Sequence, residues 1–176
     1  MRKIVLTFGL IAGAILSVMM LIQFQFQIGF DKGAIIGYTT MVLAFLMVFF
    51  GVRSYRDNVA GGSVTFGRAF AVGLLITIVA SVCYEVTWQF VYHRLVPDFG
   101  DKYAAYAIEK AKKSGATDAQ VAAKTREMTE LNQMLKKPLV NIALTFVEPL
   151  PVGILFTLIT AVALSRKRRV QGAAMA

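Results

Sequence analysis

The sequence predicts an all-α polytopic membrane protein, in which four transmembrane helices form a bundle and an extracytoplasmic helical hairpin joins spans three and four. Three observations predict this fold. Of the 176 residues, 57% are hydrophobic and only 16% are charged, whereas soluble domains keep about a quarter of their residues charged. The apolar residues form four runs, each near or above the roughly 20 residues that cross about 30 Å of hydrocarbon as a helix. The polar residues concentrate in one segment, 95–138.

The first apolar run is expected to stay in the mature protein. It begins with two bases and contains an A-x-A sequence at 12–14, as a secretory signal does. Its apolar part before this site has only about eight residues, and the run continues well beyond it, which favours a retained signal anchor. We therefore treat 1–176 as a single membrane domain, with spans at about 4–24, 33–52, 66–92 and 139–164.

The boundaries of spans two and three carry their own signals. The charges of Arg53 and Arg56 cannot enter hydrocarbon cheaply, so span two ends before them. Thr65 is the expected N-cap of span three. That span closes at Tyr92, where an aromatic belt is followed by charge and by Pro97.

The aqueous insertion 95–138 has the pattern of two helices, at about 101–113 and 118–137. Thr117 and Gln120 have the spacing of a capping box, in which each side chain satisfies a backbone N–H of the other residue. We expect the hairpin to rest on the mouth of the bundle or on the bilayer surface. The alternative is that residues 101–137 recognise a protein partner.

The lysines and arginines beside the spans predict that both termini are cytoplasmic. Bases at 2–3, 53–68 and 166–169 fall on one side, and the first opposite loop offers only Lys32. The segment from Arg94 to Lys137 carries nine bases but also six acids, and the first helix usually dominates orientation. The net charge of +9 is thereby explained by topology, so we expect the lipid bilayer, and no nucleic acid, as the partner.

Small residues recur at helical spacing in every span, which lets helix backbones approach closely in lipid. This predicts a tight four-helix bundle, and the same residues leave a homo-oligomer open. The stripes are Gly9, Gly13 and Ser17; Gly29, Gly33 and Gly37; Ala69, Gly73, Thr77 and Ser81; and Gly153, Thr157, Ala161 and Ser165.

Glu85 in span three and Glu148 in span four are the first candidates for function, because a charge at the centre of the bilayer costs about 2.5 to 3.5 kcal/mol on insertion scales. Counting helical rise places them roughly 10 Å and 13 Å below the same, outer surface. Such a pair could share a proton, hold a cation or receive a basic ligand group. The alternative is a structural role, with hydrogen bonds to neighbours that include Trp88 and Gln89.

Pro149 and Pro151 follow Glu148 directly and remove two backbone donors, which predicts a kink in span four. A broken helix beside an acid is a feature of transport sites.

A second candidate site lies at the cytoplasmic end, where Arg53, Arg56 and Arg68 could contact an anionic lipid headgroup. The alternative is that these bases only set the orientation. Residues 62–67 have the glycine spacing of a phosphate-binding loop, but Arg68-Ala69 replaces the required Lys and Ser/Thr, so we reject that match.

No catalytic residues, cofactor or metal are expected. His93 is the only histidine and Cys83 the only cysteine, so there is no zinc constellation and no intramolecular disulfide, and Cys83 is expected to be a buried structural thiol. No G-x-S-x-G sequence indicates a serine hydrolase. We expect that the protein is not an enzyme.

Over nearly its full length the chain resembles the uncharacterised bacterial membrane-protein family called domain of unknown function 4199. The resemblance rests on four strings: GYTTM at 37–41, FFGVRSYRDN at 49–58, GSVTFGRAF at 62–70 and TFVEPLPVG at 145–153. It implies a small four-span protein of the bacterial inner membrane, without established catalytic residues. The expected function is that of a non-enzymatic accessory, structural or partner-binding membrane protein. The alternative is a small transporter or proton- or cation-coupled protein that uses Glu85 and Glu148.

Overall fold

The computed structural model describes residues 1–165; the basic run 166–169, which entered the orientation prediction, lies outside the described residues. The described chain is helical and contains no strand. Its elements are α1 (Arg2–Gln25), α2 (Phe30–Asn58), α3 (Phe66–Phe90), the π-helical turn η1 (Val91–Leu95), α4 (Phe99–Lys113), α5 (Asp118–Leu135), α6 (Pro138–Val147) and α7 (Leu150–Leu164).

Within residues 1–165, four segments are long and apolar enough to cross a membrane. They are α1, α2, α3 with η1, and α6 with α7. The predicted all-helical, four-span fold is therefore confirmed. The helices extend somewhat beyond the predicted spans, most of all α2, which continues in helical form to Asn58.

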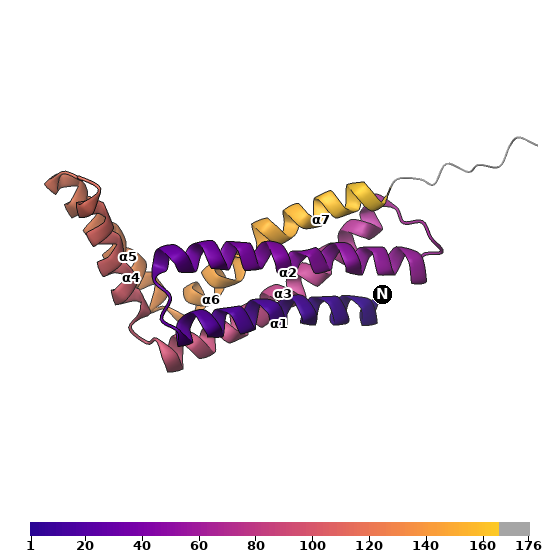
Figure 1. Ribbon diagram of the computed structural model, residues 1–176, viewed down its shortest axis with the longest axis horizontal. Coiled ribbons are helices and arrows are strands. Elements are labelled where there is room, and N and C mark those ends of the chain that lie inside the picture. Colours follow the sequence, from indigo (N-terminus) through magenta and orange to yellow (C-terminus); the bar gives the residue numbers. More distant parts are fainter. Residues whose placement is uncertain (166–176) are drawn as a thin grey trace, which may run out of the picture.

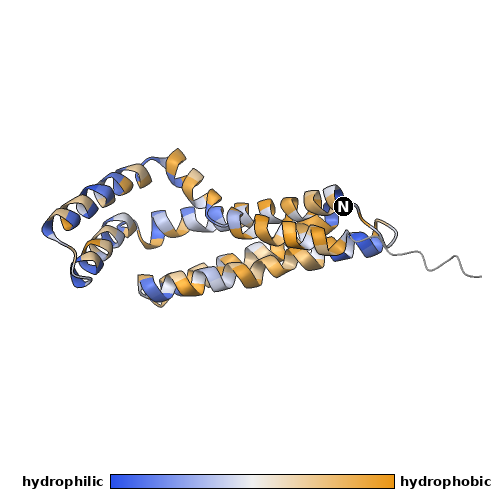
Figure 2. Cartoon of the chain, turned by 90° about the horizontal axis from the view of Figure 1, so that it is seen from above, coloured by the Kyte–Doolittle hydropathy of each residue, from blue (hydrophilic) through white to orange (hydrophobic). Residues whose placement is uncertain are grey.

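The spans lie lengthwise beside one another, while α4 and α5 stand together at the end opposite the N-terminus (Figure 1). Hydrophilic residues are concentrated on α4 and α5, and the long helices are mostly hydrophobic (Figure 2). Helix α3 is central, because it packs against α1, α2, α6 and α7. The side of the membrane on which α4 and α5 lie stays a prediction.

Small residues form the contact between α3 and α7 in a reciprocal arrangement. A Cβ added at Gly73 would meet Thr157, and one added at Gly153 would meet Thr77 and the ring of Phe45. The Thr77 hydroxyl also donates to the carbonyl of Gly153 at 3.4 Å. The glycines here bring the two backbones close enough for this bond, as the small-residue pattern predicts.

Glycines also bring α1 and α3 close together. A Cβ at Gly9 would meet Val79 at 2.7 Å, and one at Gly13 would meet Cys83. Cys83 is half-buried rather than buried, because it lies at the edge of this helix contact. The stripe in α2 is different: Gly29 and Gly37 have open space where a Cβ would be, so the prediction that it packs against another helix is wrong.

Two predicted helix starts have the expected caps. The backbone N–H of Arg68 donates to the Thr65 hydroxyl at 3.5 Å. At the start of α5, Thr117 and Gln120 form both bonds of the capping box. Helix α4 begins two residues earlier than predicted, and α5 ends two residues earlier.

Candidate functional site

Span four is interrupted at Glu148 and Pro149, between the end of α6 and the start of α7. Pro149 and Pro151 have no N–H, so the carbonyls of Thr145 and Val147 lose the helical donors that would otherwise bond them. Helix α6 packs on α3 and α5, whereas α7 packs on α2 and α3. The interruption thus gives α6 and α7 different directions and different neighbours.

A cavity of about 860 Å³ lies in the half of the bundle that contains α6, next to α4 and α5. Residues from α1 to α6 line it, and most are apolar or aromatic. Gly33 and Gly37 of α2 are among them, which explains why Gly37 has open space in front of it. The aromatic and charged side chains of the lining are Phe24, Phe30, Asp31, Tyr38, Tyr84, Trp88, Phe99, Tyr103, Tyr106, Lys110, Lys124 and Glu148.

Aromatic rings form the part of the cavity wall where α4 meets α2 and α3. Phe99 of α4 lies with its ring centroid 4.8 Å from that of Trp88, in an edge-to-face arrangement. Phe30 lies 4.9 Å from Tyr106 and 5.4 Å from Tyr103. These contacts attach α4 to α2 and α3, because edge-to-face pairs contribute about 0.5 to 1.5 kcal/mol beyond their buried area.

Glu148 supplies one carboxyl group of the cavity wall, and Asp31 supplies another. The Oε2 of Glu148 accepts a hydrogen bond of 3.1 Å from the Tyr84 hydroxyl. The ten residues of α6 separate Glu148 from the start of span four by about 15 Å of helix, which is half of the roughly 30 Å hydrocarbon core. At this depth Glu148 is exposed and lines the cavity.

An ion pair between α2 and α4 lines the cavity. The Lys110 ammonium of α4 donates to Asp31 of α2 and lies 5.5 Å from the ring centroid of Tyr106. The hydrogen bond to Asp31 raises the pKa of Lys110 above its ordinary value. The lysine therefore stays charged at neutral pH, and the pair adds no net charge to the cavity.

Glu85 points to a different surface of α3 and does not line the cavity. It is 8% exposed, and its Oε1 accepts a hydrogen bond of 2.7 Å from Gln89. Its Oε2 and the hydroxyl of Ser81, one turn earlier, are buried and have no hydrogen-bond partner within the described chain. Unpaired buried oxygens are rare in folded proteins and call for an explanation.

Asn141 of α6 joins Gln89 and Trp88 into one cluster. Its Oδ1 accepts from Trp88 at 3.0 Å and from Gln89 at 2.9 Å, while its Nδ2 donates to the carbonyl of Leu135. The side chain is 2% exposed. Sequence reasoning did not select Asn141, although an amide inside an apolar run is itself a signal, because such groups bond across helices.

The two glutamates are thus placed on separate networks. Glu85 belongs with Gln89, Trp88 and Asn141, and Glu148 belongs with Tyr84 and the cavity. Among the described residues, no hydrogen bond joins one carboxyl group to the other. Adjacent residues of a helix point about 100° apart, so Tyr84 and Glu85 direct the two acids to different surroundings.

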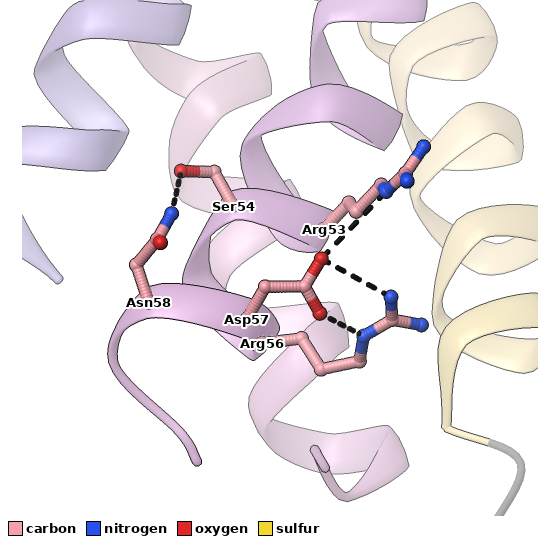
Figure 3. A network of polar contacts seen from close by, with 5 residues as sticks. All are labelled: Arg53, Ser54, Arg56, Asp57 and Asn58. Carbon is pink, nitrogen blue, oxygen red and sulfur yellow. Dashed lines mark hydrogen bonds and ion pairs between the residues drawn. The ribbon is translucent and has the colours of Figure 1, made fainter. Parts of the chain in front are cut away.

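At the other end of the bundle, Arg53 and Arg56 share the carboxylate of Asp57 (Figure 3). The Nε atoms of Arg53 and Arg56 lie 3.6 Å and 2.7 Å from it. These pairs form within the last turns of α2, which explains why the helix continues past the predicted end of span two. Arg68, at the start of α3, is exposed and does not join this cluster.

Metal-binding side chains do not gather: within residues 1–165, no three His, Cys, Asp or Glu side chains lie close enough together to hold a metal ion.

Fold and site together define a polytopic helical membrane protein with a half-open aromatic cavity in one half of its bundle. The chain belongs to the family described as "Protein of unknown function (DUF4199)", whose model matches residues 7–166. No curated protein and no solved structure matches the chain.

Proposed function

We propose that this protein is a non-enzymatic integral membrane protein that binds a small amphipathic molecule in the cavity between α2 and α6. The observation that carries the proposal is the cavity of about 860 Å³, because small-molecule sites are typically mostly apolar clefts of about 300 to 1,000 Å³ with a few polar groups. Here the polar groups are Glu148 and Tyr84 at one end and the pair of Asp31 and Lys110 at the other.

The proposal places the protein in the bacterial inner membrane with both termini cytoplasmic, which the bases beside the spans support. The cavity then opens in the outer half of the bilayer, and α4 and α5 cover it from the extracytoplasmic side. A protein partner that bound residues 101–137 would therefore act directly on the cover of the cavity. This is how an accessory role and a ligand site would be connected.

The lone tryptophan gives a direct test. Trp88 lines the cavity, so bromine-labelled dodecanol bound there is expected to quench its fluorescence. In nanodiscs of phosphatidylcholine, the quenching should saturate as the probe is added. Gly37→Phe, which places a ring in the open space of the cavity, should weaken binding at least roughly tenfold.

Gly67→Phe is the matched control, because Gly67 also has open space at its Cβ position but does not line the cavity. It should bind the probe as the wild type does. Quenching that rises without saturation, equally in all three proteins, would mean that Trp88 senses only probe dissolved in the bilayer and would contradict the proposal.

A second candidate function is proton or cation coupling at Glu85, and it is favoured by the unpaired oxygens of Glu85 and Ser81.

If Glu85 conducts protons, proteoliposomes should dissipate a pH gradient faster than protein-free vesicles. The rate should return to that of empty vesicles in Glu85→Gln, while Glu130→Gln, on the exposed surface of α5, keeps the wild-type rate. An internal pH dye measures the rate, and equal rates in all samples would exclude this function.

A further inference from the structure

The charged groups of the cavity are not balanced. Asp31 is paired with Lys110, and Lys124 is paired with Glu127 at 2.8 Å. Each pair is neutral in sum. Glu148 has no basic partner, and the hydrogen bond from Tyr84 is its one bond to another described side chain. An ionised Glu148 would therefore give the cavity a net charge of one negative unit.

The position of Glu148 in the bilayer core favours the binding of a positively charged ligand group beside it. A carboxylate in the bilayer core is costly, and a cation beside it offsets that cost, whereas a neutral or negative group does not. Attraction between opposite charges is also stronger in the low-dielectric interior than in water. Glu148 is therefore expected to distinguish ligands by the sign of their charge.

The aromatic groups around the cavity favour the same class of ligand. Tyr84 and Trp88 lie one helical turn apart on α3, about 6 Å of rise, and both line the cavity, so the wall beside Glu148 is aromatic. Cations are attracted to the faces of Trp and Tyr rings. The Lys110 ammonium already lies 5.5 Å from the ring centroid of Tyr106 in the outer part of the cavity.

We propose that the cavity selects amphiphiles with a cationic head, such as lipophilic amines and quaternary ammonium compounds, and that Glu148 is the residue that recognises the head group. The proposal rests on the proposed function, since it assigns a ligand class to the same cavity. The apolar chain of the ligand would lie along α2 and α6, where Tyr38 and Leu144 line the cavity.

The test uses three bromine-labelled probes of one chain length: dodecyltrimethylammonium, dodecanol and dodecanoate, each titrated against Trp88 fluorescence in phosphatidylcholine nanodiscs at pH 8. Affinities are referred to the measured concentration of each probe in the bilayer. The ammonium probe should bind at least roughly tenfold more tightly than the other two. Glu148→Gln should remove this preference while dodecanol binding is retained, which also shows that the variant is folded.

Glu130→Gln serves as the matched control, because it removes a carboxyl group that lies outside the cavity, and it should keep the preference. If all three probes saturate with equal affinity and Glu148→Gln changes none of them, the cation selectivity is wrong while the proposed cavity function stands. If no probe gives saturable quenching in the wild type, both proposals fail.

Discussion

Replacing Asn141 by leucine is expected to destabilise the protein by about 2 kcal/mol or more. Asn141 bonds the indole of Trp88, the amide of Gln89 and the carbonyl of Leu135. Leucine has a similar size but cannot bond, so these buried groups lose a partner, at about 1 to 3 kcal/mol for an unsatisfied group. Interhelical hydrogen bonds measured in membranes are weaker, with a mean of about 0.6 kcal/mol each. Because three bonds are lost, the expected destabilisation of about 2 kcal/mol is consistent with this lower value.

Thermal unfolding in detergent measures the loss of stability, and the emission of Trp88 should shift because its indole N–H loses an acceptor. Asn58→Leu is the control. Asn58 lies exposed at the end of α2 and donates only to Ser54, so its replacement should change stability by no more than about 0.5 kcal/mol. Equal losses in the two variants would show that the Asn141 cluster does not stabilise the bundle.

Replacing Gly153 by alanine is expected to destabilise the contact between α3 and α7 by about 1 to 3 kcal/mol, the usual cost of overpacking a close-packed site. The added methyl group would collide with the Thr77 side chain and approach the Phe45 ring at 3.0 Å. Thr77 and Phe45 are fully buried and have little room to move. Separating the helices would also lengthen the bond from Thr77 to the Gly153 carbonyl.

The matched variant is Gly67→Ala, in the first turn of α3, where a Cβ meets nothing within 4 Å. Alanine is a better helix former than glycine by up to about 1 kcal/mol, so this variant should be as stable as the wild type or more stable. Unfolding by denaturant in mixed micelles compares the two. A Gly153→Ala protein of unchanged stability would mean that the helices can separate at no cost.

The spans could be predicted from sequence because the requirement is local. Each run must be apolar over the thickness of the bilayer, and charges such as Arg53 interrupt it. The two caps, at Thr65 and Thr117, were also predictable, since a cap depends on residues within one turn. In each of these cases the deciding residues are close in the chain, and no knowledge of the neighbouring helices is needed.

The cavity was not predictable, because it depends on the direction that α6 takes after the break. Pro149 and Pro151 indicate that span four bends, but not that α6 packs on α3 and α5. Glycine spacing likewise does not show which glycines contact a neighbouring helix. Gly37 and Gly153 belong to similar stripes, yet one faces the cavity and the other contacts Thr77.

The turn η1 at the end of span three was missed for a related reason. The His93 ring nitrogen bonds the carbonyl of Gln89 at 2.9 Å, and the N–H of Val96 bonds the carbonyl of Val91, five residues earlier. A side chain that competes for a helix carbonyl in this way is visible only in three dimensions. The pattern of apolar and aromatic residues gives no sign of it.

The central position of α3 has a consequence for the synthesis of the protein. Thr77 and Glu85 lie on surfaces that span four contacts directly or through Gln89 and Asn141. Span four is made last, after the whole of α4 and α5. Until that span is made, Thr77 lacks its partner Thr157, and Gln89 lacks its partner Asn141, so the polar interior of the bundle is completed only when span four packs against α3.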